Sequence, residues 1–136
     1  MTLEQLNGYA RLRRELEKAE NLKASLMESA ELGAQAFSGL PHAPGYRDKL
    51  GAVVPKILDE LPSIEEQINS LRKETLYRES AVDMFIASIP DLQTRHIFKL
   101  RFCGGFTWTW IANAIGGGNT ADGVKKRCYR YLDSHA

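Results

Sequence analysis

The sequence has few cysteines, and they lie far apart. Cys103 and Cys128 are the only two in 136 residues, which is too few for a framework of disulfides in a chain of this length. A zinc site built from them with His96 and His135 would lack the closely spaced ligand pairs that are typical of zinc proteins. We therefore expect no metal site and no cofactor, and we expect both cysteines to be small core residues.

The sequence also lacks long apolar runs. No stretch approaches the roughly 20 apolar residues that a membrane-spanning helix needs. The opening segment, MTLEQLNGYARLRRELEK, mixes charged and apolar positions and has no short apolar core of the kind found in signal peptides. These absences predict a cytoplasmic protein that does not insert into a membrane.

Catalytic motifs are absent as well. The three histidines are far apart and have no nucleophile motif nearby, and the glycine run at 116–118 does not fit the GxxxxGK[ST] pattern of a phosphate-binding loop. The carboxylates fall on predicted helical surfaces beside lysines and arginines, where they are ordinarily solvated. We therefore predict that the protein is not an enzyme and has no catalytic residues.

Charge is distributed unevenly along the chain. The net charge is only +1, but residues 1–94 hold 11 basic and 15 acidic residues, whereas residues 95–136 hold 7 basic and 2 acidic ones. An acidic segment is thus followed by a strongly basic one. This asymmetry indicates a polyanionic partner for the C-terminal end of the chain.

The first part of the chain has apolar residues at helical spacing. The segment from residue 3 to about 35 is predicted to form one helix, because apolar residues recur in steps of three or four at Leu3, Leu6, Tyr9, Leu12, Leu16, Ala19, Leu22 and Leu26. The segment 37–47, FSGLPHAPGYR, holds two glycines and two prolines. We expect it to be a loop.

A second apolar stripe begins at Leu50 and alternates steps of four and three, as in a heptad seam. Its positions are Leu50, Val54, Ile57, Leu61, Ile64, Ile68, Leu71, Thr75, Arg78, Val82, Phe85 and Ile89. Pro62 is expected to kink this helix or to split it. The two helices predict a hairpin or coiled-coil arm over 1–89 that acts as a spacer or oligomerisation element. The seam could pair within one chain or between the chains of a homodimer.

The C-terminal segment, 90–136, is predicted to form a compact module of three helices. Pro90 disfavours helical backbone at the residue before it, and Asp91 can cap a helix that extends to about residue 103. The glycine pair at 104–105 should end that helix, because a glycine readily adopts the left-handed conformation that closes helices.

Two further helices follow in this module. Thr107 can cap a short helix whose apolar face is formed by Trp108, Ile111, Ala112 and Ile115. The glycines at 116–118 then lead into a final helix of about 120–133. The apolar side of that helix is predicted to be Val124, Cys128, Tyr131 and Leu132.

The opposite side of the final helix is basic. Lys126 and Arg130 lie on it, and Lys125 and Arg127 flank it. A short helix, a glycine turn and a basic helix form the helix-turn-helix pattern, in which the last helix enters the major groove of DNA. The fold prediction is therefore all-α, with a long N-terminal helical hairpin or coiled-coil arm followed by a helix-turn-helix module that binds double-stranded DNA.

The expected DNA contacts are polar or aromatic residues on or before the final helix. Basic side chains attract phosphates, residues near the start of the helix reach base edges, and an aspartate can accept a hydrogen bond from cytosine. The predicted set is Asn119, Thr120, Asp122, Lys125, Lys126, Arg127, Tyr129 and Arg130.

The C-terminal module resembles region four of bacterial sigma-70 factors. The segment DLQTRHIFKLRFCGGFTWTWIANAIG is similar to the LRY/LRF segment, glycine turn and IA..LG helix of that region, and GVKKRCYRYL is similar to its V-K-x-R…L spacing. The turn GGGNTADG is about two residues longer than is typical of that region, so the promoter preference of sigma factors does not carry over.

The whole chain resembles a narrower group, the small phage and prophage regulators of ArpU/RinA type that control late phage genes. This resemblance implies a transcriptional regulator in a bacterial host cell, with host RNA polymerase as a possible partner. Two alternatives stay open. One is a DNA-recognition subunit of a phage packaging machine, similar to a small terminase, and the other is a helical interaction protein that does not bind DNA.

Overall fold

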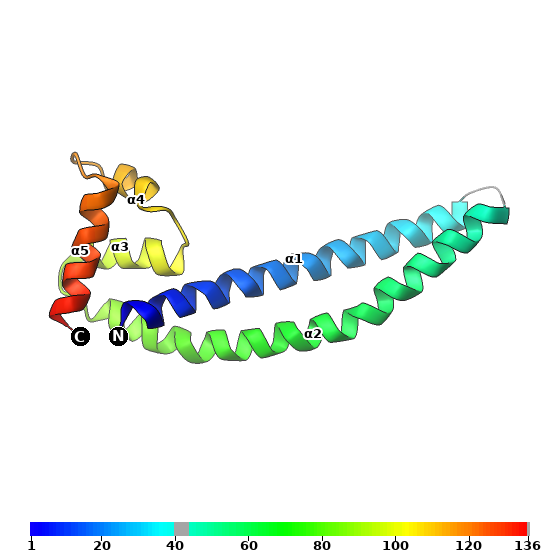
Figure 1. The fold of residues 1–136 in the computed structure, drawn as a ribbon, viewed down its shortest axis with the longest axis horizontal. Helices are drawn as coiled ribbons and strands as arrows, with labels where there is room; N and C mark the ends of the chain where they lie inside the picture. Colours follow the sequence, from blue (N-terminus) through cyan, green and yellow to red (C-terminus); the bar gives the residue numbers. More distant parts are fainter. Residues whose placement is uncertain (40–43, 136) are drawn as a thin grey trace. The chain divides into compact units, whose positions relative to one another are not determined.

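The fold consists of helices. The structure, a computed structural model, describes the backbone of residues 1–39 and 44–135 and the side chains of residues 1–33, 56 and 59–135. Within those residues the elements are α1 (Leu3–Gly39), α2 (Pro44–Ala87), α3 (Leu92–Phe98), the π-helical turn η1 (Lys99–Cys103), α4 (Trp108–Ile115) and α5 (Ala121–Ser134) (Figure 1). The predicted all-α class is confirmed. No helix in the described part of the chain is long and apolar enough to cross a membrane.

The two long helices extend further than the sequence predicted. The expected loop over 37–47 was too long, because α1 continues to Gly39 and α2 already begins at Pro44. A proline fits the first position of a helix, since the N–H that it lacks would have no partner there. The remaining part of the predicted loop, 40–43, lies outside the described residues.

Pro62 does not split α2, which runs as one helix from Pro44 to Ala87. Pro62 is exposed. The carbonyl that loses its helical partner to this proline can therefore be hydrated, which makes a proline inside a long helix tolerable. The first stripe positions of this helix, Leu50, Val54 and Ile57, have side chains outside the described residues.

The chain divides into two compact units, and the division does not follow the predicted boundary at 89/90. One unit contains residues 14–73, and the other contains residues 1–13 together with 74–136. The second unit therefore includes the predicted C-terminal module, the N-terminal end of α1 and the C-terminal end of α2. The assignment of 1–89 and 90–136 to separate functions stays a prediction.

Within the 14–73 unit, α1 and α2 run antiparallel (Figure 1). Arg72 binds Glu20 at 2.9 Å, and Lys23 binds Glu65 at 3.3 Å. A later residue of α1 thus pairs with an earlier residue of α2, as expected for antiparallel helices. On α2, the stripe residue Ile68 is buried, whereas Leu61 and Ile64 are partly buried. Pairing of this seam between two chains stays a prediction.

The other unit has one hydrophobic core that draws on helices from both ends of the chain. Its buried residues come from α1, the end of α2, α3, η1, α4 and α5, and they are Leu6, Tyr9, Val82, Ile86, Ile89, Ile97, Phe98, Phe102, Ile111, Ala112, Val124, Cys128 and Leu132. The Arg13 guanidinium also donates a hydrogen bond to the carbonyl of Cys103 at the end of η1. The first turns of α1 are thereby part of the framework that holds α4 and α5.

Candidate nucleic-acid interface

α3 begins at the predicted cap and closes on the predicted glycines. The Asp91 side chain accepts a hydrogen bond from the backbone N–H of Thr94 at 3.0 Å. The helix then widens into η1, where the N–H of Gly104 reaches back to the carbonyl of Lys99 at 3.0 Å. Gly105 has a φ of 73°, the left-handed conformation expected at this position.

α4 is short and has one buried face. The Thr107 hydroxyl caps it by accepting from the N–H of Trp110 at 3.2 Å, as the sequence predicted. Ile111 and Ala112 are buried in the core of this unit. The small side chain at Ala112 permits close packing, and the most extensive helix packing in this unit is between α4 and α5.

The turn between α4 and α5 depends on its glycines. Gly116, Gly117 and Gly118 have φ values of 71°, 67° and 73°. Residues other than glycine rarely adopt such positive φ values. The Asn119 side chain closes the turn by donating to the Gly116 carbonyl at 2.7 Å. Three consecutive glycines with positive φ and this hydrogen bond define the entry into α5.

α5 is amphipathic in the predicted sense. Thr120 caps it by accepting from the N–H of Gly123 at 3.0 Å. Val124, Cys128 and Leu132 are buried, which confirms most of the predicted apolar side. Tyr131 is half-buried and packs edge-on against two phenylalanines of the core, Phe85 and Phe98.

Three basic side chains lie on the exposed side of α5. Lys126 forms an ion pair with Asp122 at 2.9 Å, and both side chains are largely exposed. Lys125 is exposed, with its ammonium group 5.6 Å from the centre of the Tyr129 ring. Arg130 is also exposed, and its guanidinium has no hydrogen bond or ion pair with any residue that the structure describes. These three cations are accessible to a polyanion.

Arg127 has a different environment from these three residues. Its guanidinium donates to the Asp91 carboxylate at 2.6 Å, to the Thr94 hydroxyl at 3.1 Å and to the amide oxygen of Gln93. The sequence predicted that Arg127 contacts DNA. In the structure it is bonded to the start of α3, because residues distant in sequence supply acceptors that helical periodicity cannot reveal.

Asn119 and Thr120, two other predicted contacts, have structural roles in addition. The Asn119 amide N–H₂ closes the glycine turn, and the Thr120 hydroxyl caps α5. Both residues remain exposed at the surface. The eight predicted residues therefore lie on α5 and the turn before it. Some of them are exposed cations, whereas Asn119, Thr120 and Arg127 form hydrogen bonds that hold α5 in place.

Burial disfavours the reactive thiolate form of both cysteines. Cys128 is completely buried, and burial raises the pKa of its thiol to about 12. Cys103 is half-buried, and burial raises its pKa as well. Within the part of the chain that the structure describes, no three His, Cys, Asp or Glu residues come together as metal ligands.

Two aromatic contacts beside α4 were not predicted from the sequence. The Arg101 guanidinium lies 4.6 Å from the centre of the Trp108 ring and also donates to the Phe106 carbonyl at 3.0 Å. The rings of Phe106 and Trp110 are stacked, with centres 3.9 Å apart, and both are partly exposed. The partners of these aromatic residues depend on the path of the chain after η1, which helical periodicity does not reveal.

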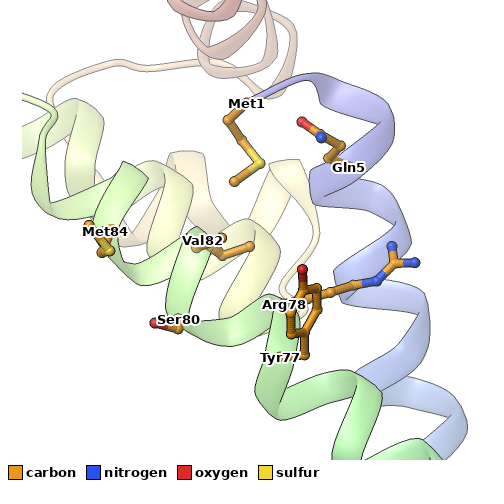
Figure 2. Close-up of a pocket in the computed structure, with 8 residues that line it drawn as sticks. Met1, Gln5, Tyr77, Arg78, Ser80, Val82 and Met84 are labelled. Atoms are coloured by element: carbon orange, nitrogen blue, oxygen red, sulfur yellow. The ribbon is translucent and has the colours of Figure 1, made fainter.

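A groove of about 600 Å³ lies in the same unit, between the first turn of α1 and the end of α2 (Figure 2). Its walls include Met1, Gln5, Tyr77, Ser80, Val82 and Met84. Arg78, the charged side chain at its edge, is paired with Glu74 at 3.1 Å. The groove is mostly apolar and lacks a cluster of reactive groups, so it is suited to packing rather than to chemistry.

No protein family, no curated protein and no solved structure matches the chain. The likeness to sigma region four and to ArpU/RinA-type regulators therefore stays a hypothesis.

Proposed function

We propose that the protein binds double-stranded DNA in a sequence-specific manner through α5, and that it acts as a transcriptional regulator encoded by a phage or prophage. The observation that carries the proposal is the contrast between the two sides of α5. Val124, Cys128 and Leu132 are buried, while Lys125, Lys126 and Arg130 are exposed. The regulatory and phage parts of the proposal come from the sequence resemblance.

The physical case is electrostatic and steric. An α-helix fits the major groove of DNA, and each phosphate neutralised by a lysine or arginine releases bound counterions. Among the described residues, Lys126 forms its ion pair with Asp122 on the same exposed surface, and such pairs contribute little to stability. The lysine can therefore exchange this partner for a phosphate at small cost.

The proposal is tested first by selecting duplexes from a randomised pool with the purified full-length chain. Fluorescence anisotropy then compares an enriched duplex with a scrambled duplex of the same composition. We expect the enriched duplex to bind at least tenfold more tightly, which corresponds to about 1.4 kcal/mol. Equal affinity for the two duplexes would contradict sequence-specific binding, and failure to bind any duplex at low salt would contradict DNA binding altogether.

The packaging alternative is separated from a regulator by assembly. A ring-forming recognition subunit has a mass of many chains in solution, whereas a regulator is a monomer or dimer. Light scattering on the same sample measures this mass directly. We expect one or two chains, and a large closed ring would favour the packaging subunit.

A helical interaction protein is favoured by a separate observation. On α2, Leu76, Tyr77 and Met84 are 65%, 84% and 73% exposed, next to the apolar groove. Exposed apolar residues that cluster often mark contact surfaces. Reversing the charges of Lys126 and Arg130 distinguishes the two functions, because an interaction protein that does not bind DNA would keep its activity.

A further inference from the structure

The contacts of Arg127 connect α5 to the start of α3. One guanidinium reaches three acceptors at the N-terminal cap and first turn of α3, namely Asp91, Gln93 and Thr94. Thr94 is buried, and the Arg127 side chain is 38% exposed. The partners are 33 to 36 positions away in sequence, so the network fixes the relative placement of two helices and is not a local pairing.

Asp91 is shared between two tasks in this network. Its carboxylate caps α3 through the backbone N–H and the hydroxyl of Thr94, at 3.0 and 2.6 Å, and it accepts from Arg127 at 2.6 Å. The hydrogen bonds from the Thr94 hydroxyl and N–H, followed by the nearby Arg127 charge, lower the pKa of Asp91. The acceptor is therefore ionised at neutral pH, and a charge-assisted bond of this kind is strong.

The geometry of this network requires a guanidinium. Arginine presents several N–H donors in a rigid planar fork, whereas lysine is a flexible point charge. A lysine at position 127 would keep the charge of the helix but could not hold Asp91, Gln93 and Thr94 in the same arrangement. A contact to a DNA phosphate depends mainly on the charge, so a lysine at position 127 would largely preserve it.

We propose that Arg127 is a positioning residue that sets the orientation of α5 on α3 through Asp91, and thereby determines sequence specificity without contacting DNA. This inference rests on the proposed function. Base readout depends on the placement of a helix in the groove, whereas attraction to phosphates depends on the number of exposed cations. Loss of the network should therefore reduce specific binding and leave nonspecific binding nearly unchanged.

The test compares Arg127→Lys with Asp91→Asn in the full-length chain. Asparagine keeps an oxygen that can cap α3, so this second variant weakens the ion pair while retaining the helix start. Binding to the enriched duplex and to the scrambled duplex is measured across a salt series. Circular dichroism confirms the helical content and melting temperature of each variant, and Lys126→Ala serves as the control for a phosphate contact.

If Arg127 acts as a positioning residue, the two variants should lose the same amount of affinity for the enriched duplex. Each should lose roughly tenfold in affinity for the enriched duplex, a loss in the range expected for disturbed base readout. Arg127→Lys, which keeps the charge, should keep its affinity for the scrambled duplex and an unchanged salt slope. Asp91→Asn removes an anion, so it should bind the scrambled duplex at least as tightly as the unmodified chain does. The two substitutions combined should cost less than the sum of the separate losses, because they break the same network.

A direct DNA contact predicts a different pattern. With Arg127 on a phosphate, Arg127→Lys would retain most of its affinity for the enriched duplex. Asp91→Asn would bind the enriched duplex at least as tightly as the unmodified chain, because it releases a cation and removes an anion. That pattern would overturn the positioning role while leaving the proposed function intact. If the unmodified chain bound no duplex, the proposed function itself would fail. Asp91→Asn decides the matter if Arg127→Lys folds poorly.

Discussion

Tyr9 is buried without the hydrogen bond that its hydroxyl group normally requires. The side chain is 1% exposed, and the hydroxyl has no hydrogen-bond partner among the described residues. Arg13 is close, with its guanidinium 5.8 Å from the centre of the Tyr9 ring, and it donates a hydrogen bond to the Cys103 carbonyl. Removing a buried, unpaired polar group while keeping its shape can stabilise a protein.

We predict that Tyr9→Phe raises the free energy of unfolding by about 1 kcal/mol at neutral pH. The ring still fills the same space between α1 and the core, and only the unpaired hydroxyl is removed. Urea denaturation of the two proteins measures the difference. A loss of stability of similar size would mean that the hydroxyl has a partner in solution.

The same residue predicts how stability changes at alkaline pH. Burial raises the pKa of Tyr9 from 10.0 to about 12, so the folded state holds its proton over a range in which the unfolded state has lost it. Stability should therefore fall as pH rises from about 10 to about 12. Tyr9→Phe should lack this part of the decline. Denaturation at several pH values tests this, and an unchanged decline would show that other groups cause it.

At the scale of elements, the turn before α5 places the strictest requirement on backbone conformation. Gly116, Gly117 and Gly118 all have positive φ, and a Cβ built on Gly117 would meet nothing closer than 3.8 Å. Space is therefore not the constraint at this position. The constraint is the backbone conformation itself.

We predict that Gly117→Ala destabilises the protein by about 1–2 kcal/mol, the cost of left-handed backbone for an ordinary residue. Gly117→Asn should cost less, because asparagine tolerates that region better. Thermal melting of the three proteins gives the order. Equal stability of the glycine and alanine forms would mean that the turn adopts another conformation in solution.

Elements with local causes could be predicted from the sequence, and those with distant causes could not. Asp91 and Thr107 cap their helices as expected, because capping involves residues within one turn. The role of Arg127 was missed, since its acceptors lie in another helix. The π-helical turn η1 also gave no signal, because apolar spacing does not distinguish it from the end of an α-helix.

At the scale of the whole molecule, the ends of the long helices contribute to the core that supports α5. Leu6 is completely buried in the same cluster as Val124 and Cys128. The charge boundary and Pro90 suggested a module that begins at residue 90. Sequence patterns could not show that residues 1–13 belong with it, because that association depends on the path of α1 and α2.

We predict that Leu6→Ala lowers the free energy of unfolding by about 2–5 kcal/mol, the usual cost of a cavity left by a buried leucine. Leu76→Ala is the matched control, since that leucine is 65% exposed, and it should cost much less. Chemical denaturation followed by tryptophan fluorescence reports on the unit that contains α4, because both tryptophans, Trp108 and Trp110, lie in that helix. A similar small effect for both variants would show that α1 does not support this core.

The most direct test of DNA binding by α5 is the salt dependence of affinity for the enriched duplex, measured for the unmodified chain and for Lys126→Ala. The account predicts a steep fall of affinity with salt, and a log–log slope that is smaller by about one unit in the variant. Lys73→Ala, which removes an exposed lysine of α2, should leave the slope unchanged. Identical slopes for the unmodified chain and Lys126→Ala, or no binding to duplex at low salt, would contradict the claim that the exposed basic side of α5 binds DNA.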